Sequence, residues 1–154
     1  MSHREDLIGI LELSRSKMLE QLDRIDIERY VYPLWSVREI LAHLSGWDEA
    51  VIIFISAIMA GQVPPTLTAQ SIDEYNVESL AARKNLDYGQ TFREYVDVRA
   101  ELIKLLRDVP ENKITAEYVL PWGSKGTIED IVNIWGSHEE EHAVDVENFN
   151  AQSE

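Results

Sequence analysis

Apolar residues recur every three or four positions along four long stretches of the chain, which is the period of an amphipathic helix. The first stretch runs from Glu5 to Ile25 and the second from Ser36 to Ala60. The third spans Thr91 to Val109, and the last runs from Thr127 to Phe149. None of them alternates between apolar and polar residues as a half-buried strand does. The pattern therefore predicts an all-α protein.

Capping residues mark the ends of these stretches. Ser36 with Glu39 and Thr127 with Asp130 have the spacing of a capping box, in which each side chain bonds to the backbone N–H of the other residue. Gly61 follows the second stretch, where a glycine commonly ends a helix. The predicted second and last helices are therefore bounded by local sequence signals as well as by periodicity.

The segments between the long stretches are shorter and more polar. A loop with Pro64-Pro65 follows the second helix, and a short extra helix is predicted from Ile72 to Leu86. Residues 118–123 have the composition of a short extended segment. Four amphipathic helices pack most simply as a four-helix bundle. We therefore expect one domain over residues 1–154, with the short helix between the second and third long helices.

Composition limits the classes of function. The 154 residues carry 28 acidic and 14 basic side chains, which give a formal net charge of −14. A charge of this sign repels phosphates, so we expect neither direct nucleic-acid binding nor attachment to an anionic membrane. The chain has no cysteine, which excludes disulfides, thiolate metal sites and a cysteine nucleophile. The apolar run from Val51 to Ala60 is too short to span a bilayer, and a cytoplasmic protein is expected.

Three of the four histidines fall on the apolar sides of predicted helices. His138 and His142 are four residues apart, so they lie on one face of the last helix, and His43 flanks the apolar stripe of the second. A buried imidazole without a partner costs about 1–3 kcal/mol. One divalent metal ion would satisfy all three, and three protein ligands leave a position open for substrate or water. Histidines that only pack in the core are the alternative interpretation.

Carboxylates next to these histidines are further candidates. The segment His138 to His142 also matches the H-E-x-x-H pattern of zinc metalloproteases, with Glu139 as the general base. The match is weak because Glu139 is one of three consecutive glutamates in an acidic protein. Glu139 is still a candidate base for metal-activated water, and Asp145 is placed to orient a metal ligand.

Aromatic residues fall into two groups. Two tryptophans lie on the apolar stripes and are expected to pack in the core: Trp47 and Trp135. Four others lie in connections and are candidates for lining the mouth of a site: Tyr30, Tyr32, Tyr118 and Trp122.

Two motifs resemble a known family. The segment Trp35 to Leu44, followed by Trp47-Asp48, resembles the second-helix signature of the DinB-like (damage-inducible) superfamily, and the last-helix histidine pair resembles its second ligand motif. The resemblance implies a four-helix bundle, often a homodimer, with a three-histidine site for zinc, nickel or a similar ion. In this sequence the matching ligand positions are His43, His138 and His142.

The resemblance leaves two functions open. Relatives include thiol-dependent S-transferases and isomerases, which use a low-molecular-weight thiol as cofactor, and some hydrolases. The first hypothesis is therefore a metal-dependent enzyme of one of these types, acting on a small-molecule substrate at an open metal position. The alternative is a non-catalytic metal-binding stress-response module, its site closed by a fourth ligand such as Asp48 or Glu139.

Overall fold

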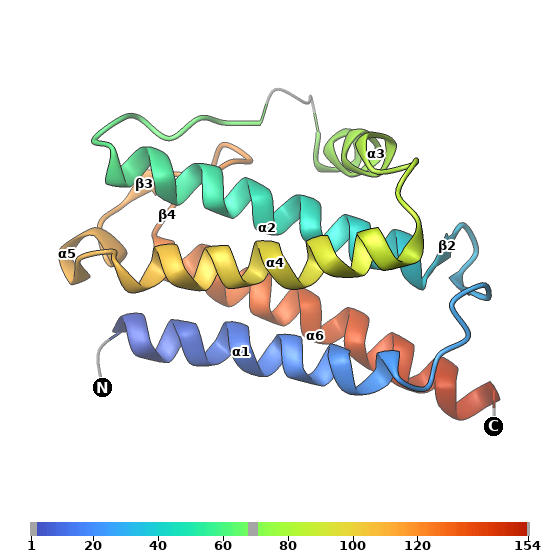
Figure 1. The fold of residues 1–154 in the computed structure, drawn as a ribbon. Coiled ribbons are helices and arrows are strands. Elements are labelled where there is room, and N and C mark those ends of the chain that lie inside the picture. Colours follow the sequence, from blue (N-terminus) through green and yellow to red (C-terminus); the bar gives the residue numbers. More distant parts are fainter. Residues whose placement is uncertain (1–2, 68–70, 154) are drawn as a thin grey trace.

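The computed structural model describes residues 3–67 and 71–153. Within these ranges, four helices have twenty residues or more: α1 (His3–Leu22), α2 (Val37–Met59), α4 (Tyr88–Arg107) and α6 (Ile128–Ser153). They pack side by side (Figure 1). The predicted all-α four-helix bundle is confirmed.

The four helices form two parallel pairs. Helices α1 and α6 run in one direction, and α2 and α4 run in the opposite direction (Figure 1). Helix α1 packs most extensively on α6, and α2 packs most extensively on α4. Smaller contacts join α1 to α4 and α2 to α6, which close the bundle. The order is therefore not a simple alternation of up and down helices.

The predicted capping residues bound α2 and α6. The Ser36 N–H donates to the Glu39 carboxylate at 3.1 Å. The Thr127 N–H donates to Asp130 at 2.9 Å, and the Asp130 N–H donates back to the Thr127 hydroxyl at 3.0 Å. Gly61 has a φ of +72°, the left-handed conformation that ends many helices. Local sequence signals thus fix both helices that carry the histidines.

The shorter elements lie between the long helices. The expected extra helix is α3 (Ile72–Ala82), and a short turn of helix, α5 (Glu111–Ile114), was not predicted. Two antiparallel hairpins pair β1 (Tyr30–Tyr32) with β2 (Trp35–Ser36) and β3 (Tyr118–Val119) with β4 (Lys125–Gly126). The strand β3 confirms part of the predicted extended segment.

Helix α4 begins earlier than predicted. It starts at Tyr88, not at Thr91, because Asp87 and Gln90 form a capping box with hydrogen bonds of 2.8 and 3.0 Å. Helix α1 ends at Leu22, three residues before the predicted Ile25. Neither difference moves an apolar stripe away from the core.

Helix α2 contributes many buried residues to the core. It is long and apolar enough to cross a membrane, but 72% of its most apolar stretch is buried inside the bundle. Its buried residues run along nearly its whole length, as expected for a core helix surrounded by protein.

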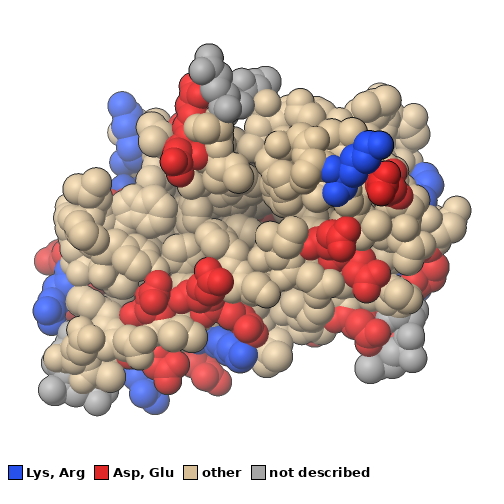
Figure 2. Space-filling view, turned by 180° about the vertical axis from the view of Figure 1, so that it is seen from behind, with Lys and Arg blue, Asp and Glu red and all other residues tan. Residues whose placement is uncertain are grey.

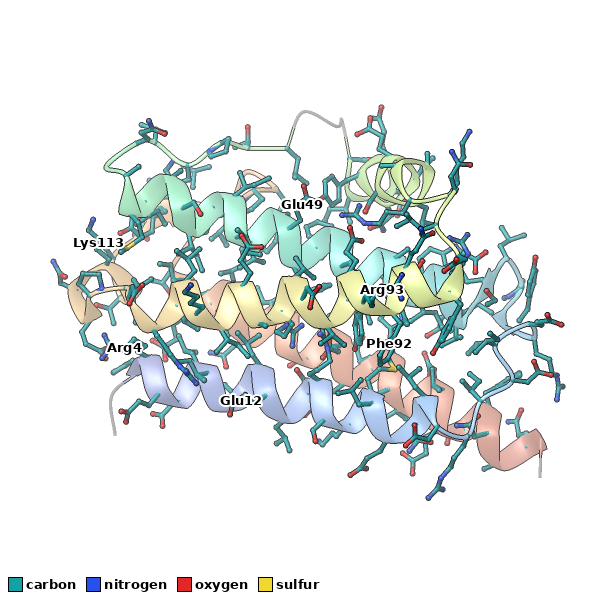
Figure 3. All side chains as sticks on the ribbon, viewed as in Figure 1. Arg4, Glu12, Glu49, Phe92, Arg93 and Lys113 are labelled. Atoms are coloured by element: carbon teal, nitrogen blue, oxygen red, sulfur yellow. The ribbon has the colours of Figure 1, made fainter. Side chains whose placement is uncertain are left out.

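Basic side chains hydrogen-bond to backbone carbonyls at one end of the bundle. Arg4 donates to the Val109 carbonyl at 3.1 Å, and Lys113 donates to the Ile58 carbonyl at 3.3 Å, which satisfies groups at helix ends. Both side chains lie at the end of the bundle opposite the β1–β2 hairpin, whereas the exposed Glu12 lies midway along the bundle (Figure 3).

Candidate metal centre

The three histidines singled out in the sequence meet at one point between α2 and α6. The Nε2 atoms of His43 and His138 are 3.4 Å apart, and those of His138 and His142 are 3.1 Å apart. One nitrogen from each of the three rings lies within 4.8 Å of the other two. His43 is 3% exposed, and the two α6 rings are half-buried. The helix repeat places His138 and His142 one turn apart on the same face.

The spacing of the nitrogens fits one small divalent ion. Imidazole nitrogens bind zinc at about 2.0–2.1 Å, and a tetrahedron with such bonds has edges of about 3.3–3.4 Å. The two measured Nε2 distances lie close to that edge length. In His138 it is Nε2 that faces the other two rings, at 3.4 and 3.1 Å from their Nε2 atoms, so its ring offers Nε2 as the coordinating atom.

The rings are uncharged near neutral pH. Burial and, to a smaller extent, the neighbouring His142 and His138 together lower the pKa of His43 to about 3. Burial, followed by the charge of His138, lowers the pKa of His142 to about 4. Burial also lowers the pKa of His138. Each ring therefore keeps a nitrogen lone pair available for a cation.

A tyrosine and a carboxylate orient His142. The Tyr32 hydroxyl lies 2.8 Å from Nδ1 of His142 and donates to Asp145 at 2.5 Å. Because the Tyr32 proton is directed to Asp145, its oxygen is free to accept the Nδ1–H of His142. That tautomer directs the lone pair of Nε2 toward the other two histidines. Burial, then the Asp145 hydrogen bond, raises the pKa of Tyr32.

Two tryptophans hold the other rings in place. The ring centre of Trp35 lies 5.0 Å from that of His43, and the ring centre of Trp135 lies 4.8 Å from that of His138, with the two ring planes tilted by 34°. The indole N–H of Trp135 donates to Asp48 at 2.5 Å. The orientation of His138 is therefore linked to a buried carboxylate through the Trp135 ring.

Beside the histidines, the four long helices contribute one buried charged residue each. Arg15 comes from α1, Asp48 from α2, Arg99 from α4 and Glu139 from α6, and none is more than 6% exposed. Both arginines donate to both carboxylates at 2.9–3.3 Å. We call these residues the four-helix charge cluster. Its two positive and two negative charges balance, which offsets the cost of burying them.

This cluster changes the interpretation of two sequence candidates. Both oxygens of Glu139 accept hydrogen bonds from Arg15 and Arg99. A general base needs a lone pair that faces the reacting proton, so this placement does not suit Glu139 as a base. Asp48 is likewise occupied by Arg99, Arg15 and Trp135, which does not suit it as a fourth metal ligand.

The sequence carries a signal for this cluster that was not used. Arg15 lies one turn after buried Leu11, and Arg99 lies one turn after buried Tyr95. A charged residue on an apolar stripe is costly to bury unless it is paired. Two such arginines and two acidic residues on comparable stripes therefore predict a buried ion network.

A cavity of about 350 Å³ opens beside the histidines. Its described walls are made by eight residues: His43, Trp47, Ile72, Asn76, Trp122, Ile134, Trp135 and His138. Because His43 and His138 form part of the wall, a molecule in the cavity lies next to the point where the three rings meet. A concave, mostly apolar site with a few convergent polar groups is typical of small-molecule binding.

The aromatic candidates are distributed between the core and the site. Trp47 and Trp135 are 6% and 5% exposed, so they are core residues as predicted, and they also line the cavity. Trp122 lines the cavity, and Tyr32 contacts His142 directly. Two others lie away from the cavity wall: Tyr30, which is 58% exposed, and Tyr118, which packs edge-on against Phe54.

Comparison with known proteins identifies related folds. The sequence model described as DinB superfamily matches residues 10–144. A mycothiol-dependent maleylpyruvate isomerase superposes with a TM-score of 0.78 at 18% identity, over 95% of this chain and 63% of that one. YfiT from Bacillus subtilis, described as "a probable metal-dependent hydrolase with an unusual four-helix bundle topology", gives 0.76 at 15% identity over 97% and 87%.

A third similar structure is the colibactin self-resistance protein ClbS in complex with a dsDNA. It has a TM-score of 0.76 at 16% identity, over 96% of this chain and 95% of that one. At these identities the similarity shows a shared fold. A search of curated proteins found no match.

Proposed function

Because this chain belongs to the DinB superfamily, we propose that it is a metal-dependent enzyme whose ion is bound by His43, His138 and His142. The observation that carries the proposal is the approach of their Nε2 atoms to 3.1–3.4 Å, close to the edge of a zinc-sized tetrahedron. The sequence alone had left open whether these histidines merely pack in the core. Zinc and nickel are the ions that we expect.

A divalent ion at this point would supply a Lewis acid, which lowers the pKa of a coordinated thiol or water. The residues of the chain would hold and orient it. His43 enters from α2 and the other two from α6, and Tyr32 with Asp145 fixes the ring of His142. The cavity beside His43 and His138 would hold the substrate.

Among the enzyme types, thiol-dependent transfer is supported best. A carboxylate that assisted an attacking water would need a free lone pair, but Glu139 and Asp48 accept from arginines and Asp145 accepts from Tyr32. A free thiol has a pKa of about 8.5, against about 15.7 for water, so a much smaller lowering by the ion makes it an ionised nucleophile at neutral pH. Since the chain has no cysteine, the sulfur would come from a low-molecular-weight thiol.

The fold comparisons support this choice, but this chain matches only part of the similar isomerase. The similar isomerase depends on mycothiol, but this chain covers 63% of its length. The thiol and the substrate are therefore proposals for this chain. We also propose a small-molecule substrate and not DNA, because a net charge of −14 opposes binding to phosphates even though ClbS was crystallised with dsDNA.

The metal proposal is tested by elemental analysis of protein purified without an affinity tag. We expect about one zinc or nickel ion per chain, and loss of that ion when His43, His138 and His142 are all replaced by alanine. His3→Ala is the matched control, because His3 pairs with Glu129 and is not part of the cluster. Circular dichroism would show whether the triple variant remains helical. Unchanged metal content in a folded triple variant would refute the proposal.

The thiol proposal is tested by thermal shift. Metal-loaded protein is heated with glutathione, cysteine or mycothiol, and in parallel with their S-methyl derivatives, which cannot form a thiolate. We expect stabilisation by at least one free thiol and none by its S-methyl form. Stabilisation by no thiol, with the ion demonstrably bound, would contradict this part of the proposal.

The resemblance also favours a homodimer, which mass measurement in solution would distinguish from the 17.7 kDa chain.

A further inference from the structure

Indole rings dominate the wall of the cavity. The ring centre of Trp47 lies 6.2 Å from that of Trp122 and 6.1 Å from that of Trp135. Two isoleucines, Ile72 and Ile134, complete the apolar wall. Flat aromatic surfaces favour flat partners, because ring stacking adds to the free energy gained from apolar burial. The shape and composition of the wall therefore favour a planar ligand.

Two of the indole N–H groups of the wall already have partners. The indole N–H of Trp47 donates to the side-chain oxygen of Asn76 at 2.8 Å, and that of Trp135 donates to Asp48. These two rings therefore present carbon faces to the cavity. Asn76 also hydrogen-bonds with the His43 side chain, so what it can offer a ligand is a remaining amide N–H, which suits a neutral acceptor such as a carbonyl, ether or nitro oxygen.

The cavity wall has no cation to receive an anionic group. None of the described residues that line it is a lysine or arginine. Figure 2 shows this face of the molecule, where the side chains around the central hollow are uncharged and acidic side chains are spread over the surroundings. A carboxylate placed against the indole rings, away from an ion at the histidines, would lose its hydration without gaining an ion pair, and the net charge of −14 would repel it.

We propose that this cavity binds an uncharged aromatic or conjugated planar group of the substrate, stacked on Trp47, Trp122 and Trp135 and directed toward His43 and His138. The inference rests on the proposed function, since it names the substrate class of the same site. It excludes carboxylates and phosphate esters from the part of the substrate that stacks on the three indole rings, and places no such restriction on a group that binds the ion itself.

Tryptophan fluorescence offers a direct test with a matched pair of probes. 4-Nitrobenzyl alcohol and 4-nitrobenzoate have similar rings and both quench indole fluorescence, but only the second carries a charge. We titrate them into protein kept metal-free with a chelator, so that neither probe can bind through an ion. Titration of N-acetyltryptophanamide corrects for absorption by the probes. We expect saturable quenching by the alcohol, with affinity at least about tenfold higher than that of the carboxylate.

A charge introduced at the rim should change this preference. Ile134 lines the cavity and is 52% exposed, so Ile134→Lys can be accommodated and would place an ammonium beside the ligand. Ile53→Lys on α2 is the matched control, because Ile53 is 49% exposed and is not part of this cavity wall. We expect Ile134→Lys to abolish or reverse the preference for the alcohol, and Ile53→Lys to leave it unchanged.

Three results would overturn the inference. They are equal or tighter binding of the carboxylate by the unmodified protein, no saturable binding of either probe, and the same change in preference for Ile53→Lys as for Ile134→Lys. Because the titration contains no metal, its outcome is independent of the elemental analysis. If the protein binds no ion but still discriminates between the probes, the metal proposal is refuted and the inference about the cavity is retained.

Discussion

Replacing Glu139 with glutamine tests the four-helix charge cluster. The carboxylate is fully buried and accepts four hydrogen bonds, two from Arg15 and two from Arg99. Glutamine has nearly the same shape but no charge, so the variant leaves two buried guanidinium groups with Asp48 as their single counter-ion. The change therefore removes charge balance from the core without creating a cavity.

The expected loss is large compared with the stability of the whole chain. Removing one partner of a buried ion pair costs about 3–5 kcal/mol. Domains are usually stable by about 5–15 kcal/mol, so the variant should lose about a fifth or more of its free energy of unfolding. Glu140→Gln is the control, because Glu140 pairs with Lys17 at 2.8 Å on the surface, where both side chains are 41–48% exposed. An exposed pair contributes less than about 1 kcal/mol.

Urea unfolding of the metal-free proteins, followed by circular dichroism, measures both losses. We expect a clearly lower midpoint for Glu139→Gln at a similar slope, and a midpoint close to that of the unmodified protein for Glu140→Gln. Adding Arg99→Met restores neutrality and should recover part of the loss. Since Glu139 is not placed as a ligand, folded Glu139→Gln should still bind metal. A loss no greater than that of Glu140→Gln would refute the reasoning.

Three further results are expected. Tyr32→Phe removes the acceptor of the His142 Nδ1–H and should weaken metal binding about 10–100-fold in a chelator competition, whereas exposed Tyr30→Phe should have no effect. The pKa values of His43 and His142, about 3 and 4, lie below that of an unfolded histidine. At pH values between the folded and the unfolded pKa, the unfolded chain therefore binds more protons than the folded chain. Melting of the metal-free protein should therefore show stability falling from pH 7 to pH 5, and less steeply in His43→Ala; an equal slope would contradict this. Zinc at about 100 times its Kd should stabilise the protein by about 2.7 kcal/mol in calorimetry, and His138→Ala should lose most of that gain.

The bundle was predictable because its signals are local. Periodicity gave the four long helices, and the capping pairs at Ser36 and Thr127 placed two of their starts to within one residue. The spacing of His138 and His142 required only the helix repeat, and the structure brings His43 to the same point. The start of α4 was predicted too late because the capping residue Asp87, although visible in the sequence, was not used.

The surroundings of the histidines could not be predicted in the same way. Asp48 and Glu139 were considered as ligands or a base, because a carboxylate near histidines suits metal chemistry. Their arginine partners lie 33 to 124 positions away along the chain, so only the packing of four helices reveals the pairing. The cavity depends in the same way on Trp47, Trp122 and Trp135, which come from separate segments.

The four-helix charge cluster also selects the alignment of the helices. Sliding α6 by one turn, about 5.4 Å, would withdraw Glu139 and bring Trp135 or Ala143 opposite the two guanidinium groups. Either arrangement would strand an excess positive charge in the interior, whereas a purely aliphatic seam tolerates such slippage. A misaligned packing therefore loses more free energy than the intact cluster contributes to the correct one. The cluster thus disfavours every alignment but the native one.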